Sequence, residues 1–163
     1  MKTARNRHSI RIMGIFAVWA ILFSLSACSS NEIFSEFYSF PDAQWDAKDT
    51  VRFEVPVSDL FNAYAIYLTV RNNNQYPFRN LWLFAELQKP DGTLRLDTFS
   101  VKLADVYGKW YGNGVSLYSL SILYEKPVQY PDTGVYVYRF RQGMRARVLE
   151  GVSDLGLRVE TVD

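Results

Sequence analysis

Carboxylates are the side chains of this sequence that could carry out acid–base chemistry. The set considered is Asp91, Asp97, Asp105, Asp132 and Asp154. Two carboxylates on either side of a glycosidic bond are the usual machinery of sugar hydrolysis, so a glycosidase is one hypothesis. Asp91 and Asp132, however, each follow a proline in a turn sequence. Aspartate is common there because its side chain hydrogen-bonds nearby backbone. The pattern therefore favours turns over a catalytic pair.

Aromatic residues on one segment form a second candidate site. Trp82 and Phe84 occupy alternate positions in the stretch RNNNQYPFRNLWLF, after an asparagine run at 72–74 that is typical of a loop. With Tyr67 they could form a shelf that stacks sugar rings or contacts a partner protein. The alternative is that residues 72–78 form a hairpin connection. Its return strand would run from Leu81 to Leu87, lie in the centre of the sheet and be covered on both faces.

A third candidate is the segment from Leu103 to Gly114, which holds three glycines and the aromatic residues Tyr107, Trp110 and Tyr111. The spacing does not match a phosphate-binding loop, because no strand–GxGxxG–helix context surrounds it. The segment is either a structured loop pinned by Trp110 or a partner-binding loop, since loops on rigid scaffolds often carry function.

Basic residues are concentrated near residue 140, and an anionic lipid or an acidic partner could bind there. The set is Arg139, Arg141, Arg145 and Arg147. A solvated strand face followed by a loop is the favoured interpretation.

The N-terminus has the pattern of a bacterial lipoprotein signal. Four basic residues precede an uncharged, apolar stretch from Ile12 to Ala27, which is shorter than the roughly 20 residues of a membrane-spanning helix. The segment ends in Leu25-Ser26-Ala27-Cys28, which resembles a lipobox. We therefore expect cleavage before Cys28 and lipidation of its sulfur, and two acyl chains are enough for stable anchoring.

Removal of residues 1–27 changes what chemistry is available. The single histidine, His8, is removed, and the single cysteine, Cys28, is lipidated. Neither a Ser-His-Asp or Cys-His nucleophile nor a His/Cys zinc site can then be built. The mature chain carries 14 basic and 17 acidic residues, about −3, and lacks the basic patch that nucleic acid requires. We expect no enzyme activity, no metal and no cofactor.

The remaining residues have a period of two, which is typical of strands. Alternation runs through residues 51–57, 64–71, 81–87, 135–140 and 155–160, with turn sequences at 89–92, 112–114 and 130–134. Residues 117–125 fit either a strand or a short helix. The predicted fold is all-β, an antiparallel β-sandwich of jelly-roll or immunoglobulin-like type. We expect a signal peptide at 1–27, a tether with an aromatic lead-in that packs on the domain at 28–48, and the sandwich at 49–163.

Four motifs link the chain to a known family. RNNNQYPFRNLWLF, KPDGTLRLDT, LADVYGKWYGNG and LEGVSDLGLRVE occur in this order and span the mature domain. Together with Cys28 they resemble the gliding-motility lipoprotein GldH family of Bacteroidetes. One departure is Phe78, where the family tends to have a tyrosine. The resemblance implies an envelope lipoprotein required for gliding, in bacteria that export adhesins by type IX secretion. Of the family's functional residues, it transfers only the lipidated Cys28.

Two functional hypotheses follow. The first is a non-enzymatic scaffold or assembly factor that is held on the membrane by Cys28 and binds other motility or secretion proteins. The second is a carbohydrate-binding module that uses exposed aromatic residues. The candidate surface in both is Trp82, Phe84, Tyr107, Trp110 and Tyr111. Position 29 is serine, and residues 29–32 hold one acid, so we expect the outer membrane, facing the periplasm.

Overall fold

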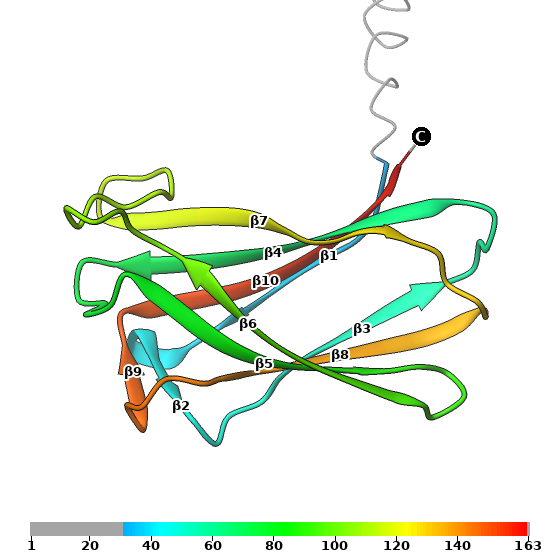
Figure 1. Cartoon of the computed structure of the whole chain (residues 1–163), viewed down its shortest axis with the longest axis horizontal. Helices are drawn as coiled ribbons and strands as arrows, with labels where there is room; N and C mark the ends of the chain where they lie inside the picture. The colour runs from blue at the N-terminus through cyan, green and yellow to red at the C-terminus, as the bar shows by residue number, and fades with distance from the viewer. Residues whose placement is uncertain (1–30, 163) are drawn as a thin grey trace, which may run out of the picture. The chain divides into compact units, whose positions relative to one another are not determined.

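The computed structural model describes residues 31–162 as one body of antiparallel sheets (Figure 1). The predicted signal peptide and Cys28 lie outside the described residues. The strands are β1 (Glu32–Ser39), β2 (Gln44–Asp46), β3 (Val51–Val57), β4 (Ala63–Asn73), β5 (Asn80–Gln88), β6 (Leu94–Lys102), β7 (Leu117–Val128), β8 (Gly134–Gln142), β9 (Val148–Glu150) and β10 (Val152–Val162). A 3-10 turn, η1 (Pro41–Ala43), precedes β2. Over these residues no helix is long and apolar enough to cross a membrane.

The strands form two four-stranded sheets and one small sheet. The first sheet has the order β1-β10-β4-β7, the second β3-β8-β5-β6, and the small sheet pairs β2 with β9. The pairs are nested: β5 pairs with β6, β4 with β7, β3 with β8 and β1 with β10. This nesting is the eight-stranded arrangement of a jelly roll. The predicted antiparallel sandwich is confirmed, and of the two alternatives it is the jelly roll.

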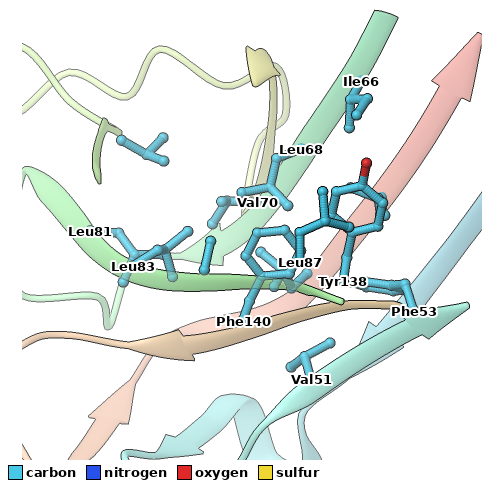
Figure 2. Close-up of a cluster of buried hydrophobic side chains, with 14 of the residues drawn as sticks. Val51, Phe53, Ile66, Leu68, Val70, Leu81, Leu83, Leu87, Tyr138 and Phe140 are labelled. Atoms are coloured by element: carbon cyan, nitrogen blue, oxygen red, sulfur yellow. The ribbon is translucent and has the colours of Figure 1, made fainter. Parts of the chain in front are cut away.

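Alternating apolar residues build the core between the two sheets. Strand β3 shows a strict alternation of buried and exposed residues, with Val51 and Phe53 among the buried ones. In Figure 2 their side chains lie with those of Leu68 from β4 and Phe140 from β8 in one cluster. The period of two places one set of side chains between the sheets, and their removal from water drives the two sheets together.

The aromatic lead-in also belongs to this body. β1 pairs with β10 along its length, and Trp45 of β2 is fully buried. The Trp45 ring stacks on Phe40 with 4.5 Å between centroids, and its Nε1 donates to the carbonyl of Asp49 at 3.1 Å. Residues before position 49 therefore supply an edge strand and part of the core. Phe37 of β1 stays exposed, beneath the guanidinium of Arg71.

Two local predictions have different outcomes. Residues 117–125, which fitted a strand or a short helix, lie in strand β7. The predicted hairpin at residues 71–84 is wrong, because β4 and β5 lie in different sheets. Of the asparagine run expected in that loop, Asn72 and Asn73 are the last residues of β4, and residues 74–79, with Asn74 and Tyr76, cross to the other sheet.

The connections gather at opposite ends of the sandwich, as the chain path in Figure 1 shows. One end, here the terminal end, carries Asn31, Val162 and the connections at 58–62, 89–93 and 129–133. The other, here the loop end, carries the connections at 40–50, 74–79, 103–116 and 143–151.

Candidate functional site

An apolar stripe covers the outer face of the second sheet. Leu81 and Leu83 of β5 point into the core, so the alternating residues Trp82 and Phe84 face outward, with 45% and 46% of their surface exposed. We call this surface the aromatic stripe, and its exposed members are Phe78, Trp82, Phe84, Leu94 and Leu96. The prediction that both faces of this strand are covered is wrong: β5 is central in its sheet, but one of its faces is open.

A glycine lets the stripe lie close to the backbone. A Cβ at Gly143 would lie 3.0 Å from the Phe84 ring, so the absence of a side chain makes room for the ring. The same glycine donates its N–H to the carbonyl of Trp82 at 2.7 Å. Met144 follows, and its Sδ accepts from the backbone N–H of Trp82 at 3.3 Å. Residues 143 and 144 thus extend the apolar surface beyond the end of β8.

Shallow depressions follow the stripe. One of about 440 Å³ is lined by Phe78, Trp82, Phe84 and Met144, among others. It shares Phe78 and Asn80 with a depression of about 630 Å³, and Phe84 with another of about 440 Å³. The three depressions therefore adjoin along the sheet, and an extended ligand or a partner's loop would find apolar and polar contacts along them.

The arginines do not form one site. Arg139 is engaged on the sheet face, where it donates to Glu86 at 2.7 Å and to Gln88 at 2.9 Å. The Nε atom of Arg147 lies 3.5 Å from the Oδ2 atom of Asp46, as an ion pair. Arg141 and Arg145 are exposed and line depressions along the stripe. Two of the four predicted cations therefore lie where they could contact a ligand on this face.

Tyr67 does not belong to the predicted shelf. It lies on β4 in the first sheet and faces away from the core, with the guanidinium of Arg158 4.6 Å from its ring centroid. Trp82 and Phe84 lie on the outer face of the other sheet, so the shelf of three rings is wrong. A period of two identifies outward residues but does not reveal which sheet a strand joins.

The glycine-rich segment is a structured loop at the loop end. The Trp110 Nε1 donates to the Asn74 side chain at 3.2 Å, and its ring lies near those of Tyr76 and Tyr118. The prediction of a loop pinned by Trp110 is confirmed. Tyr107 and Tyr111 project from it with 93% and 53% exposure, and the loop borders a depression of about 790 Å³. That this loop binds a partner stays a prediction.

The aspartates have structural partners. Asp91 accepts from the backbone N–H of Thr93 at 2.8 Å, and this bond lowers the pKa of its carboxyl. Asp105 accepts from the N–H groups of Tyr107 and Lys109, and Asp154 accepts from the Ser39 hydroxyl. Turn formation and sheet contacts therefore account for these three carboxylates. Within the described residues, no three His, Cys, Asp or Glu side chains come together as a metal site.

Comparison with known proteins identifies relatives of the whole chain. The family model described as GldH lipoprotein matches residues 32–159. The gliding motility lipoprotein GldH of Flavobacterium johnsoniae is 32% identical over 162 residues, covering 94% of this chain and 99% of the relative. A GldH homolog of Christiangramia forsetii is 30% identical, covering 91% and 97%.

Likeness to solved structures is weaker. A carbohydrate-binding module specific for non-crystalline cellulose is 15% identical with a TM-score of 0.44, covering 79% of this chain and 73% of that chain. Latent PorU from Porphyromonas gingivalis is 9% identical with a TM-score of 0.36, covering 83% and 14%. The family match and the two relatives, which agree over nearly the full length, show that the chain belongs to the GldH lipoprotein family.

Proposed function

We propose that this protein is a non-enzymatic, lipid-anchored component of the gliding-motility machinery, associated with type IX secretion, in which it acts as a scaffold or assembly factor. Residues 1–27 are removed and Cys28 carries the lipid. Membership of the GldH lipoprotein family supports the motility role. The single structural observation behind a scaffold is the aromatic stripe, which the fold leaves uncovered.

The composition of the stripe suits a protein partner. Tryptophan, phenylalanine, methionine and arginine are enriched in the buried centres of protein interfaces, whereas lysine and glutamate are depleted there. Trp82, Phe84 and Met144 lie together, and the exposed Arg145 borders them. Aromatic side chains that fill a partner's pockets contribute most of the binding energy in such interfaces. We therefore place the partner on the outer face of β5, β6 and β8.

Crosslinking in native membranes tests this assignment. A photo-reactive residue at Ser100, which lies opposite Trp82 in the register, is expected to capture an envelope protein. Trp82→Ala combined with Phe84→Ala should abolish that product. Leu123→Ala, an exposed apolar residue on the first sheet, is the matched control and should retain it. Equal capture by all three proteins would show that the stripe is not the binding surface.

A carbohydrate-binding function is the second candidate. The adjoining depressions beside the exposed Trp82 and Phe84 rings favour it, since flat aromatic rings can stack sugar faces. Glycan-array binding by the soluble domain would support it, provided that Trp82→Ala removes the signal on the stripe. Trp110→Ala tests the loop end in the same way. Absence of glycan binding together with capture of a protein would leave the scaffold as the function.

We further propose that the domain faces the periplasm from the outer membrane. Ser29 supports this, since an aspartate at that position would favour retention at the inner membrane, and only one acid lies within residues 29–32. Fractionation should then recover the protein with outer-membrane markers. Protease treatment of intact cells should leave the domain whole, and its removal would place it on the cell surface.

A further inference from the structure

The terminal end of the sandwich carries an apolar tip. Leu60 and Phe61 lie in the connection between β3 and β4, and 97% of the Phe61 surface is exposed. Removing a phenylalanine side chain from water is favourable by about 1.5–3 kcal/mol, so a fold that leaves one in solvent forgoes that gain unless something covers it. The aromatic stripe lies on the outer face of the second sheet, so this tip is a separate feature.

Hydrogen bonds hold the tip in its projecting shape. The Asp59 carboxylate accepts from the Phe61 backbone N–H at 2.8 Å and from the Asn62 side chain at 2.7 Å. The Tyr64 hydroxyl donates to the Asp59 carbonyl at 2.7 Å. Because Tyr64 is buried in the core, the loop is fastened to the sandwich, and Phe61 is presented outward.

The tip lies beside the point where the anchored chain enters the fold. Thr161 donates its backbone N–H to the Asn31 carbonyl at 2.7 Å, and Thr161 pairs with Tyr64 on β4. Adjacent strands lie about 4.8 Å apart, so Asn31 and the start of β4 are separated by about 10 Å. Cys28 precedes Asn31 by three residues. Even fully extended, three residues span no more than about 11 Å.

We propose that Leu60 and Phe61 insert into the phospholipid surface to which Cys28 is anchored, as a second membrane contact. This inference rests on the lipidation in the proposed function. A lipid at Cys28 keeps the terminal end within a short distance of the bilayer, so the apolar tip meets the interface without a further cost of bringing it there. Insertion of the tip turns the terminal end towards the membrane and the loop end away from it.

The charges around the tip define the preferred lipid. The terminal-end connections carry Asp59, Asp91 and Asp132, against one lysine, Lys89. Anionic headgroups would repel this acidic rim over about a Debye length, roughly 8–10 Å. The tip is therefore suited to zwitterionic phospholipid, and burial of its apolar side chains, not charge attraction, drives its insertion.

Depth-dependent quenching tests the inference on the full-length lipidated protein. Ser58→Cys places a fluorophore next to the tip, and Ser116→Cys places one at the loop end beside Val115, which is 91% exposed. Each protein is reconstituted into phosphatidylcholine vesicles that contain lipids with a shallow nitroxide quencher. The apolar faces of interfacial helices enter about 5–10 Å into the bilayer, and a similar depth for the tip gives at least about two-fold stronger quenching at residue 58 than at residue 116. Phe61→Ser replaces the exposed apolar ring with a small polar side chain and should clearly reduce the quenching at residue 58, while the quenching at residue 116 stays unchanged.

Vesicle flotation separates the two possible failures. A protein that floats with vesicles but shows equal quenching at both positions overturns the tip contact and leaves the anchor in place. Quenching that Phe61→Ser does not change overturns it as well. A mature protein that does not float overturns the lipid anchor itself, and the inference with it. Added phosphatidylglycerol should weaken the quenching at residue 58, whereas stronger quenching would contradict an apolar insertion.

Discussion

At the scale of single residues, two glycines share a left-handed backbone but differ in their surroundings. Gly92 has a φ of 84° with open space around it, whereas Gly151 has a φ of 83° and a Cβ there would lie 2.2 Å from the backbone nitrogen of Tyr76. Gly92→Ala is expected to lower the free energy of unfolding by about 1–2 kcal/mol from backbone strain alone. Gly151→Ala adds a clash with backbone and should cost ~4 kcal/mol or more. Urea denaturation of both variants measures the difference, and equal losses would contradict the close approach.

A buried tyrosine pair makes stability depend on alkaline pH. The Tyr130 and Tyr138 hydroxyls are 2.9 Å apart, and burial raises the pKa of Tyr130 to about 12 and that of Tyr138 further above its ordinary value. In the unfolded chain tyrosine titrates near pH 10. The folded state therefore binds more protons above that pH, so its stability is fully present below pH 10 and decreases as the pH rises towards 12.

The variant Tyr130→Phe isolates this contribution. It removes the titrating hydroxyl and should weaken the fall in the free energy of unfolding between pH 10 and 12, measured by urea denaturation. At pH 8 it should cost about 1 kcal/mol for the lost hydrogen bond. An unchanged pH profile would show that Tyr130 does not carry the effect, and Tyr118→Phe, on an exposed hydroxyl, is the control.

The sequence predicted some site residues and missed others for a physical reason. Alternation with Leu81 and Leu83 separates Trp82 and Phe84 from the core residues, so these two could be named in advance. Met144 and Gly143 could not, because they reach the stripe from about 60 positions further along the chain through the pairing of β5 with β8. Local sequence patterns do not predict pairing between strands that lie so far apart in the chain.

At the scale of elements, two contacts join β6 to β7 at one open edge between the sheets. Arg95 donates twice to Glu125, at 2.8 and 2.5 Å, and Phe99 packs on Tyr124 with 4.9 Å between ring centroids. The ion pair is substantially exposed, so Arg95→Gln should cost less than about 1 kcal/mol. Phe99→Ala should cost about 2–3 kcal/mol, because the ring is partly buried against the core. Thermal unfolding measures the stability of both variants. A larger loss of stability for Arg95→Gln than for Phe99→Ala would show that the ion pair, and not the aromatic contact, contributes more at this edge.

The strands differ in how well the sequence predicted them. Strands β3, β5 and β8 keep one phase of alternation and were predicted. Strand β6 was not, because its apolar residues change phase: Leu94 and Leu96 face outward, but Phe99 and Val101 face inward. A sliding search for a single period of two therefore fails at this strand. The order of strands within each sheet depends on pairing between distant segments, and local periodicity does not specify it.

At the scale of the whole molecule, the two ends have different environments. Strand β1 begins beside β10 at the terminal end, whereas the connection between β6 and β7 lies at the loop end (Figure 1). That connection holds Tyr107, Trp110 and Tyr111. The proposed anchor on Cys28 would keep the first end near lipid and would leave the second end, together with the aromatic stripe, accessible to the proposed envelope partners. In this proposal the attachment site and the recognition surface lie at different places along the strands of the jelly roll.

Removing the anchor should change where the protein is located without changing its stability. Cys28→Ala is expected to abolish incorporation of a clickable fatty acid and to move the protein from the membrane fraction to the soluble fraction. The core residues lie between 40 and 159, so the free energy of unfolding should change by less than about 0.5 kcal/mol, as for other substitutions outside the core. Ser29→Ala, which keeps the cysteine, is the matched control and should stay lipidated. If Cys28→Ala remains membrane-bound in high salt and carbonate after residues 1–27 have been cleaved off, the lipid is not the attachment. If it leaves the membrane and cells still glide, the scaffold does not need to be anchored to act.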